Sequence, residues 1–237
     1  MDMSVYADPY FAQPLPENAV LIVGAGHFGQ RAVRMLSGKS DSPVYVVDRD
    51  QSHLARINDR LVKPIVCDGI RFLVENFPFF SPSNIVIPAV PVHLAFEWLI
   101  TYLSDDFPAR RISVPEDTRS SLPHTWHTGD GSLLVSYADF RCPDDCPEPA
   151  DYCTVTGEKR DKPLYQLLGE LHVMDFNVHV IRSHQLAPGL GGYRVDNLLE
   201  MVRKITSQGA DKWMIGTACK CHGTLSAMEV HRALKRG

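Results

Sequence analysis

The hydrophobic pattern of the first half alternates short apolar runs with segments of helical period. Apolar runs rich in β-branched residues predict buried strands at residues 20–23, 43–47, 62–66 and 84–87, with a fifth at 110–114. The helical segments between them run to residue 36 and over 51–60, 70–77 and 94–103. Strands that alternate with helices in this way predict an α/β fold built on a parallel sheet.

The second half repeats the strand–loop–helix order three times. Its apolar runs predict strands at 133–137, 177–182 and 212–217, and helices at 164–171, 195–207 and 224–235. We expect the three strands to be parallel, and the loops that follow parallel strands leave one edge of a sheet. The sequence therefore predicts a second, smaller α/β domain with its distinctive loops on one edge.

A glycine motif separates the first strand from the first helix. Gly24, Gly26 and Gly29 form G-x-G-x-x-G, with His27 and Phe28 between the last two. The first glycine allows a tight turn, the second lets a pyrophosphate approach the backbone, and the third lets the helix pack on the strand. The N–H groups that open the helix then point at the phosphates. This context predicts a Rossmann-like, NAD(P)-binding parallel sheet, with all five residues at the cofactor.

The ends of the next strands supply further candidates for the cofactor site. Asp48 ends the second strand about 20 residues beyond the glycines, where an acid reaches the ribose hydroxyls of NAD, although it could instead cap the next helix. Arg49 suits a ribose phosphate, so NADP is the second choice of cofactor. Asp68 follows the third strand, and Pro88 and Val90 lie in the loop after the fourth, beside the same crevice.

These residues resemble the nucleotide-binding domain of potassium-transport regulators, of the TrkA-N or RCK type. The resemblance rests on LIVGAGHFGQ, on VYVVDRD and on the strand followed by a CDG turn at residues 65–69. It covers under half of the chain and leaves the second half out. It implies a domain that binds NAD(H) or an adenine nucleotide and senses it rather than catalysing a reaction.

The second half concentrates cysteine in two of its three loops. The candidate metal ligands are Cys142, Cys146, Cys153, Cys219, Cys221 and His222. Thiolates are soft ligands that select zinc, copper(I) or iron–sulfur clusters, and we expect an iron–sulfur cluster or zinc here. Thiol redox chemistry is the alternative, but the acidic neighbours disfavour reactive thiolates. In a third interpretation the cysteines pack as small hydrophobic residues.

Two histidines follow predicted strands, and one of them precedes a glycine-rich loop. His184 is the candidate catalytic group, for proton transfer or as a ligand, although a plain strand-end histidine fits as well. Gly189, Gly191 and Gly192 after it predict an anion-binding nest, or a flexible loop. His93 precedes an apolar helix, where it either faces the nucleotide or is exposed to solvent.

Composition and charge narrow the class of protein. The 237 residues are 44% hydrophobic with a net charge of -4, which favours a packed core and gives no general attraction for nucleic acid. No apolar run approaches ~20 residues, so we expect no membrane span. The polar, proline-rich start lacks a signal-peptide pattern, so we expect a cytoplasmic protein with reduced cysteines. The predicted parts are an arm over 1–17, a nucleotide domain over 18–117 and a cysteine-rich domain over 118–237, which opens with a linker.

Two functions fit this organisation. In the first, the protein is an oxidoreductase that moves electrons between NAD and a substrate near a cysteine-bound metal. In the second, it is a regulatory nucleotide sensor linked to potassium transport, and the metal is structural. A small-molecule nucleotide is the expected partner in both, and a homodimer is the candidate assembly.

Overall fold

The chain forms two compact units. The computed structural model describes residues 14–39, 42–103, 107–149, 151–208 and 211–231, so the predicted arm lies almost wholly outside the described residues. The first unit runs to Leu94 and takes in Gly192–Leu199, and the second comprises Ala95–Gly191 and the residues from Glu200 onward. The second unit thus begins before the boundary that was expected after residue 117. A short segment within its sequence, Gly192–Leu199, belongs to the first unit.

The first unit alternates strands and helices as the apolar pattern predicts. Up to the loop before Leu94 its elements are β1 (Val20–Val23), α1 (His27–Leu36), β2 (Val44–Asp48), α2 (Gln51–Leu54), β3 (Val62–Val66), α3 (Gly69–Asn76), the short η2 (Phe77–Phe79) and β4 (Ile85–Pro88). The main difference is α2, which is one turn long, whereas a helix over 51–60 was expected.

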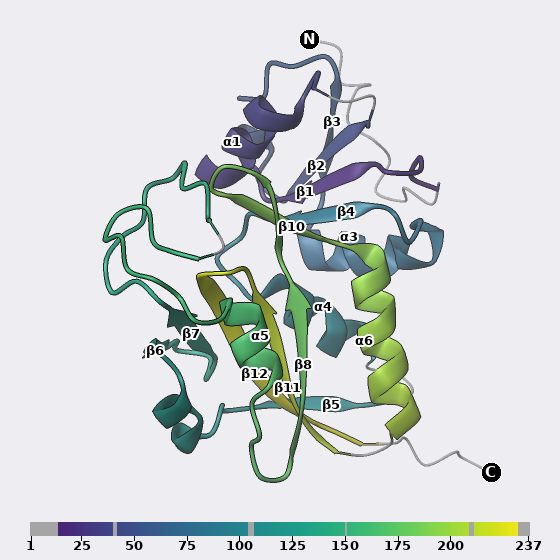
Figure 1. Cartoon of the computed structure of the whole chain (residues 1–237). Helices are drawn as coiled ribbons and strands as arrows, with labels where there is room; N and C mark the ends of the chain where they lie inside the picture. The colour runs from purple at the N-terminus through teal and green to yellow at the C-terminus, as the bar shows by residue number, and fades with distance from the viewer. Residues whose placement is uncertain (1–13, 40–41, 104–106, 150, 209–210, 232–237) are drawn as a thin grey trace, which may run out of the picture. The chain divides into compact units, whose positions relative to one another are not determined.

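The first sheet is parallel around its centre (Figure 1). Its strand order is β3-β2-β1-β4-β10-β9, in which β10 is Leu190–Arg194 and β9 is His184–Ala187. β1 lies between β2 and β4 and is parallel to both, whereas β10 is antiparallel to β4. All four residues of β1 are buried, which suits an apolar strand covered on both faces. Because the chain goes from β1 outward to β2 and β3 and then back to β4, the strand order reverses at β1, where open α/β sheets bind ligands.

The second unit contains the remaining elements. They are α4 (Leu94–Tyr102), β5 (Ala109–Ile112), the short η3 (Glu116–Ser121), β6 (His124–His127), β7 (Leu133–Ser136), α5 (Leu164–Gly169), β8 (Phe176–Arg182), most of α6 (Val195–Gln208), β11 (Lys212–Ala218) and β12 (His222–Val230). The expected linker over 120–130 includes β6, which pairs with β7 at the edge of the sheet.

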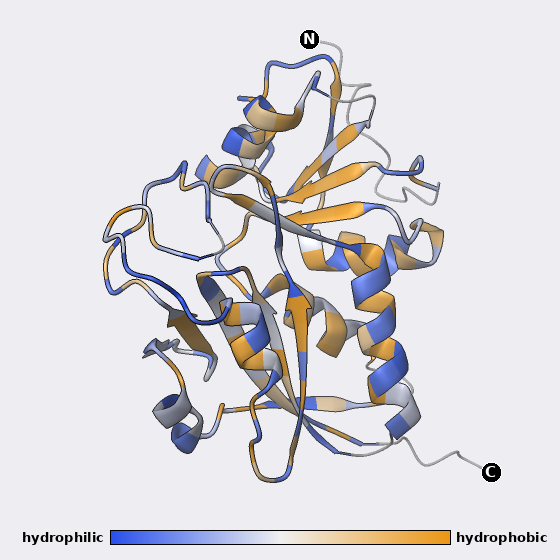
Figure 2. Cartoon of the chain, viewed as in Figure 1, coloured by the Kyte–Doolittle hydropathy of each residue, from blue (hydrophilic) through white to orange (hydrophobic). Residues whose placement is uncertain are grey.

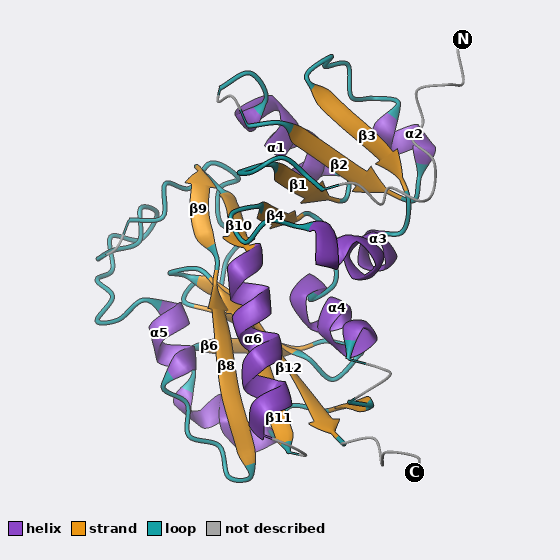
Figure 3. Ribbon diagram, turned by 90° about the vertical axis from the view of Figure 1, so that its right-hand side faces the viewer, coloured by secondary structure: helices purple, strands orange, loops and turns teal. Residues whose placement is uncertain are grey.

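The second sheet is mixed, with order β6-β7-β12-β11-β8 and β5 paired to β12. β8 is parallel to β11, and β12 is antiparallel to both β11 and β7 (Figures 1 and 3). Therefore β7, β8 and β11 all run in the same direction, as expected, although β12 separates β7 from β11. The segments that follow these three strands leave the sheet at one edge.

One prediction for each half is wrong. The helix expected over 224–235 is, in its described part, the strand β12, and the strand expected at 110–114 is β5, which pairs with β12 and not with the first sheet. Leu225, Ser226, Ala227 and Met228 are all buried, so the alternation that marks a half-exposed strand is missing. Leu225, Ala227 and Met228 are good helix formers, and pairing with strands on both sides overrides that propensity.

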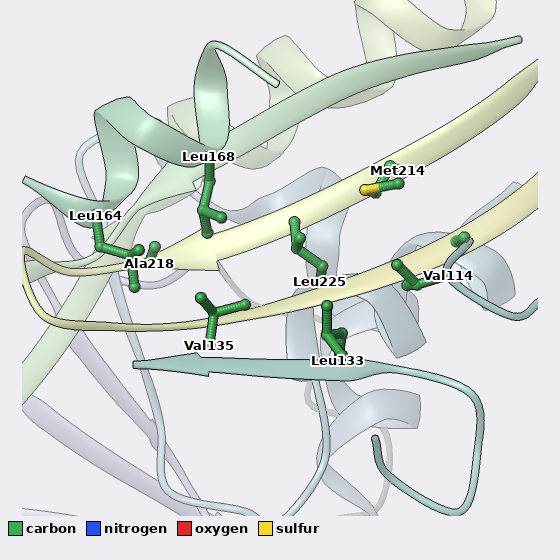
Figure 4. Close-up of a cluster of buried hydrophobic side chains, with 9 residues drawn as sticks. Val114, Leu133, Val135, Leu164, Leu168, Met214, Ala218 and Leu225 are labelled. Atoms are coloured by element: carbon green, nitrogen blue, oxygen red, sulfur yellow. The ribbon is translucent and has the colours of Figure 1, made fainter. Parts of the chain in front are cut away.

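One face of the second sheet packs against α5 (Figure 4). Leu164 and Leu168 of α5 meet Met214 on β11, Leu225 on β12 and Val135 on β7 in a cluster of fully buried side chains. These positions alternate along each strand, which leaves the intervening side chains to the opposite face.

α6 covers that opposite face within the second unit. Its Lys204 reaches His179 of β8, which alternates with the residues that face α5. Met201 and Ile205 of α6 are fully buried. The polar residues between them lie on the other side of the helix and are blue in Figure 2. Like α6, every helix in the described residues is too short or too polar to cross a bilayer.

His179 makes this packing sensitive to pH. Its ring Nδ1 lies 3.4 Å from Lys204 Nζ. Burial and then the Lys204 charge lower the pKa of His179 from 6.5 to about 4, against a smaller opposing effect of Glu200. Below pH 6.5 the unfolded chain therefore binds a proton that the folded chain excludes until about pH 4.

We predict that His179→Leu flattens the loss of stability between pH 6.5 and 4. As the pH is lowered through that window, protonation of His179 in the unfolded chain should lower the wild-type unfolding free energy by up to about 1.4 kcal/mol per pH unit. Denaturant unfolding at several pH values measures the slope. His172→Leu, at an exposed position, is the control and should keep the wild-type slope. Equal slopes for all three proteins would contradict the prediction.

Candidate functional site

The turn after β1 has a backbone that requires glycine. Gly24 has φ +103°, and its N–H donates to the carbonyl of Val47 at 2.7 Å. A Cβ at Gly24 would lie 2.5 Å from the carbonyl oxygen of Ala89 and 2.9 Å from the side chain of Val90. The loop after β4 therefore packs directly on the glycine turn and places Val90 beside it. Pro88 pairs with Val23 where β4 and β1 end.

The other two glycines of the motif have different roles. A Cβ at Gly29 would lie 1.9 Å from the carbonyl oxygen of Gly24, so close packing of α1 on the turn requires glycine there. Gly26 has nothing within 4 Å of the position of a Cβ, so it faces open space. Gly26 is also the N-cap of α1, whose first turn carries no acidic residue and no side-chain cap. Open space before an uncapped helix N-terminus suits a phosphate.

The carboxylate of Asp48 ties the end of β2 to this turn. Its Oδ2 accepts the N–H of Ala25 at 2.7 Å, and its Oδ1 accepts the N–H of Asp50 at 2.8 Å. Burial alone would raise the pKa of Asp48, but these backbone donors and the neighbouring His53 outweigh it, so the pKa is below its ordinary value. An ionised acid beside the glycine turn is the arrangement expected for a ribose acceptor.

His53 belongs to this site and was missed from the sequence. Its Nδ1 lies 3.3 Å from Asp48 Oδ2, and its Nε2 lies 3.7 Å from Asp50 Oδ2. The signal was its position in the helix that directly follows the strand-end acid, which brings its side chain back over that acid.

The remaining cofactor candidates surround the turn less closely. His27 and Phe28 open α1 with exposed side chains, and Arg49 is exposed after β2. Asp68 Oδ1 accepts the N–H groups of Ile70 and Arg71, both at 3.0 Å, so this side chain caps α3. Nucleotide contacts of these residues stay predictions. His93 is 8% exposed, so the interpretation as an exposed histidine is wrong.

His184 and the glycines after it form a hairpin. His184 starts β9 with an exposed side chain, Gly189 at φ +68° makes the turn, and Gly191 and Gly192 lie in β10. The anion-binding nest expected at these glycines is therefore wrong, because Gly191 and Gly192 lie in an extended strand and the N–H of Gly189 donates to Cys146 O. A catalytic role for His184 stays a prediction.

The cysteine-rich segments meet at one edge of the second sheet. The loop after β7 carries Cys142, and its Sγ lies 3.4 Å from Nε2 of His222, which begins β12. The same loop is bound to the β9–β10 hairpin, since Cys146 O accepts the N–H of Gly189 and the Nε2–H of Gln185, both at 2.9 Å. The common direction of β7, β8 and β11 thus brings all three loops together, as expected.

The turn between β11 and β12 carries two of the cysteines. Cys219 N–H donates to His222 O at 2.9 Å, and Cys219 Sγ accepts the N–H groups of Cys221 at 3.4 Å and His222 at 3.3 Å. The hydrogen bond between the two thiols raises the pKa of Cys219, which burial raises further, and lowers that of Cys221. The sequence contained no signal for this asymmetry.

Four cysteines line one cavity of about 70 Å³, which we call the thiol cavity: Cys142, Cys146, Cys153 and Cys221. Burial and then the neighbouring cysteines raise the pKa of Cys142, whereas backbone N–H groups of Thr156 and Val155 lower that of Cys153. Within the described residues, no group of three or more His, Cys, Asp or Glu side chains stands in an arrangement that could hold a metal ion.

We predict that Gly29→Ala destabilises the protein by at least about 2 kcal/mol, because the methyl group would overlap a backbone carbonyl. Gly26→Ala is the matched control in the same motif, and it should change the unfolding free energy by less than about 0.5 kcal/mol, since its methyl group meets open space. Denaturant unfolding measures both. Equal losses of stability in the two variants would contradict the assigned roles.

Comparisons with known proteins agree with a division of the chain into an N-terminal and a C-terminal part. Residues 20–73 match the model of the TrkA-N domain, and residues 95–231 match a family model, AF_1314_C, described as "Uncharacterized protein, C-terminal domain". A curated relative from Archaeoglobus fulgidus, printed as "Uncharacterized protein", is 30% identical over 232 residues, which cover 88% of this chain and 98% of the relative. No solved structure matches the chain. The chain therefore belongs to the AF_1314_C family, and its residues 20–73, ahead of that family's C-terminal domain, resemble a TrkA-N domain.

Proposed function

We propose that the first unit binds NAD(H) and that the protein is a nucleotide-responsive regulator. The observation that carries this proposal is the open space at Gly26, set between two glycines that close packing requires. The TrkA-N match supports a nucleotide-binding, regulatory role. The family resemblance points to potassium transport as the process that the protein regulates.

The charges around the turn favour NAD over NADP. Asp48 is held ionised at the end of β2 by the N–H groups of Ala25 and Asp50. A carboxylate hydrogen-bonds the ribose 2′-hydroxyl of NAD and repels the 2′-phosphate of NADP. Arg49 is the nearest cation in sequence, and it is exposed after the strand.

Calorimetric titration of the full chain with NADH and NADPH tests the proposal. We expect saturable binding of NADH, weaker binding of NADPH, and at least about a tenfold loss of NADH affinity in Gly26→Ala, because the methyl group occupies the space for the pyrophosphate. Arg60→Ala, at an exposed position outside the candidate site, is the control and should keep NADH affinity. No saturable binding of either dinucleotide to the folded wild type, or unchanged affinity in Gly26→Ala, would overturn the proposal.

An oxidoreductase with an iron–sulfur cluster or zinc is the second candidate function. The observation that favours it is the meeting of three loops at one edge of the second sheet, with five cysteines among them. This function requires turnover of the nucleotide, whereas a regulator requires binding alone.

Anaerobic mixing with NADH and ferricyanide separates the two functions. Each NADH oxidised releases two electrons, which reduce two ferricyanide ions. An oxidoreductase should show catalytic loss of NADH absorbance that disappears in Gly26→Ala and in Cys221→Ser. A regulator should bind NADH without turnover. We expect the second result, and sustained turnover in the wild type would instead favour the enzyme.

A further inference from the structure

We propose that the thiol cavity of the second unit is the site of a thiophilic metal centre, with Cys142, Cys146, Cys153 and Cys221 as its ligands. The centre is a zinc ion or an iron–sulfur cluster, both of which bind through thiolates. This proposal does not depend on nucleotide binding, because every residue that it uses lies in the second unit.

The cavity gathers thiols from distant parts of the chain. Three of the four come from the loop after β7 and the fourth from the turn between β11 and β12. Free cysteines that serve as small hydrophobic residues are expected among apolar side chains. The wall of this cavity includes Tyr137, Phe140 and Val155, but it also includes Thr154, Glu158, Lys159 and Arg160. Four thiols that converge from two segments, beside charged side chains, suit a bound centre better than hydrophobic packing alone.

The backbone at Cys153 is held in a tight turn. Cys153 N–H donates to Glu158 O, and the N–H of Gly157, which has φ +73°, donates to Cys153 O, both at 2.8 Å. The backbone of this ligand is therefore fixed before a metal binds, which lowers the cost of binding.

The β11–β12 turn is fixed by its own hydrogen bonds. Cys219 Sγ accepts the N–H groups of Cys221 and His222. One of those donors is Cys221, so the bond fixes the backbone of the residue that reaches the cavity. Because Cys221 lines the thiol cavity and Cys219 does not, we assign Cys221 the role of fourth ligand and Cys219 a positioning role.

A second contact holds the two cysteine-bearing segments together without any thiol. Glu148, 7% exposed, accepts the N–H of Lys220 with Oε1, and Lys220 Nζ donates to Glu148 O at 3.0 Å. Because this contact joins the loop to the turn, the protein backbone brings the ligands near one another before a metal binds. Preorganisation of this kind lowers the cost of binding.

The charge of the cavity also suits a thiolate centre. Four thiolates carry more negative charge than one Zn²⁺ or one iron–sulfur cluster neutralises. Arg160 and Lys159 line the cavity together with one carboxylate, Glu158, so the wall contributes a net positive charge against that excess. Arg160 is held there by a hydrogen bond from Nη1 to Pro149 O at 2.9 Å.

Binding a metal requires side-chain rotation. In the described residues the thiols do not stand in ligand geometry, and Cys142 Sγ faces His222 Nε2 at 3.4 Å instead of a shared centre. Cysteine has one side-chain dihedral before its sulfur, so each thiol can swing between staggered rotamers while its backbone stays in place.

Metal analysis of full-length protein purified without oxygen tests the proposal. We expect about one centre per chain: zinc with no visible absorbance, or iron with acid-labile sulfide and visible charge-transfer absorbance. Ser substitution of Cys142, Cys146, Cys153 or Cys221 should reduce the bound metal at least tenfold. Cys67→Ser, in the first unit, is the matched control and should retain it.

Titration of folded, metal-stripped wild type with Co²⁺ provides a readout that does not depend on the folding of variants. We expect a thiolate-to-cobalt charge-transfer band that saturates at one equivalent and that Zn²⁺ abolishes, or, for a cluster, a visible spectrum restored by iron and sulfide. Folded wild type that contains no metal and gives neither signal would overturn the proposal. Metal retained in Cys221→Ser but lost in Cys219→Ser would overturn the assignment of the fourth ligand.

Discussion

The pairing of β12 with the strands on both of its sides is the constraint on which the second unit depends. β12 pairs with β11 from Lys212↔Glu229 to Ala218↔Gly223, and its other edge pairs with β7 and β5. Antiparallel neighbours joined by a short turn reverse the chain at the end of β11. That reversal places Cys219, Cys221 and His222 at the edge where β7 also ends. A helix in place of β12 would have removed both the sheet centre and this turn.

The first unit depends on a different constraint, which is the close approach of backbone to backbone. The turn after β1 lies against the loop after β4 and against α1, and there is no room for a Cβ at Gly24 or Gly29. The space at Gly26 exists because the chain on either side is packed so closely. Asp48 adds a hydrogen bond from the neighbouring strand to the same turn. Packing and ligand space are thus two results of one arrangement of glycines.

The two units offer two separate kinds of chemistry. The first presents an open helix N-terminus and an ionised carboxylate, which suit an anionic dinucleotide. The second presents four thiols around one cavity, which suit a soft metal. A ligand that binds only the folded state stabilises that state by mass action, so a nucleotide and a metal would each support their own unit. A redox role for such a metal requires that the nucleotide is turned over, whereas a structural role does not.

Local sequence determined the first unit closely, because each strand is a short apolar run and each turn contains a residue with a specific backbone requirement. The strands at 20–23 and 62–66 have the predicted bounds, and the glycine spacing indicated the ligand crevice. The apolar runs also indicated β7, β8 and β11 with their common direction. Tertiary structure alone decided that Leu225–Met228 form a strand, that β5 belongs to the second sheet, and that Cys221 rather than Cys219 lines the cavity. These features depend on pairing and burial between segments far apart in the chain, and a local pattern contains no record of such partners.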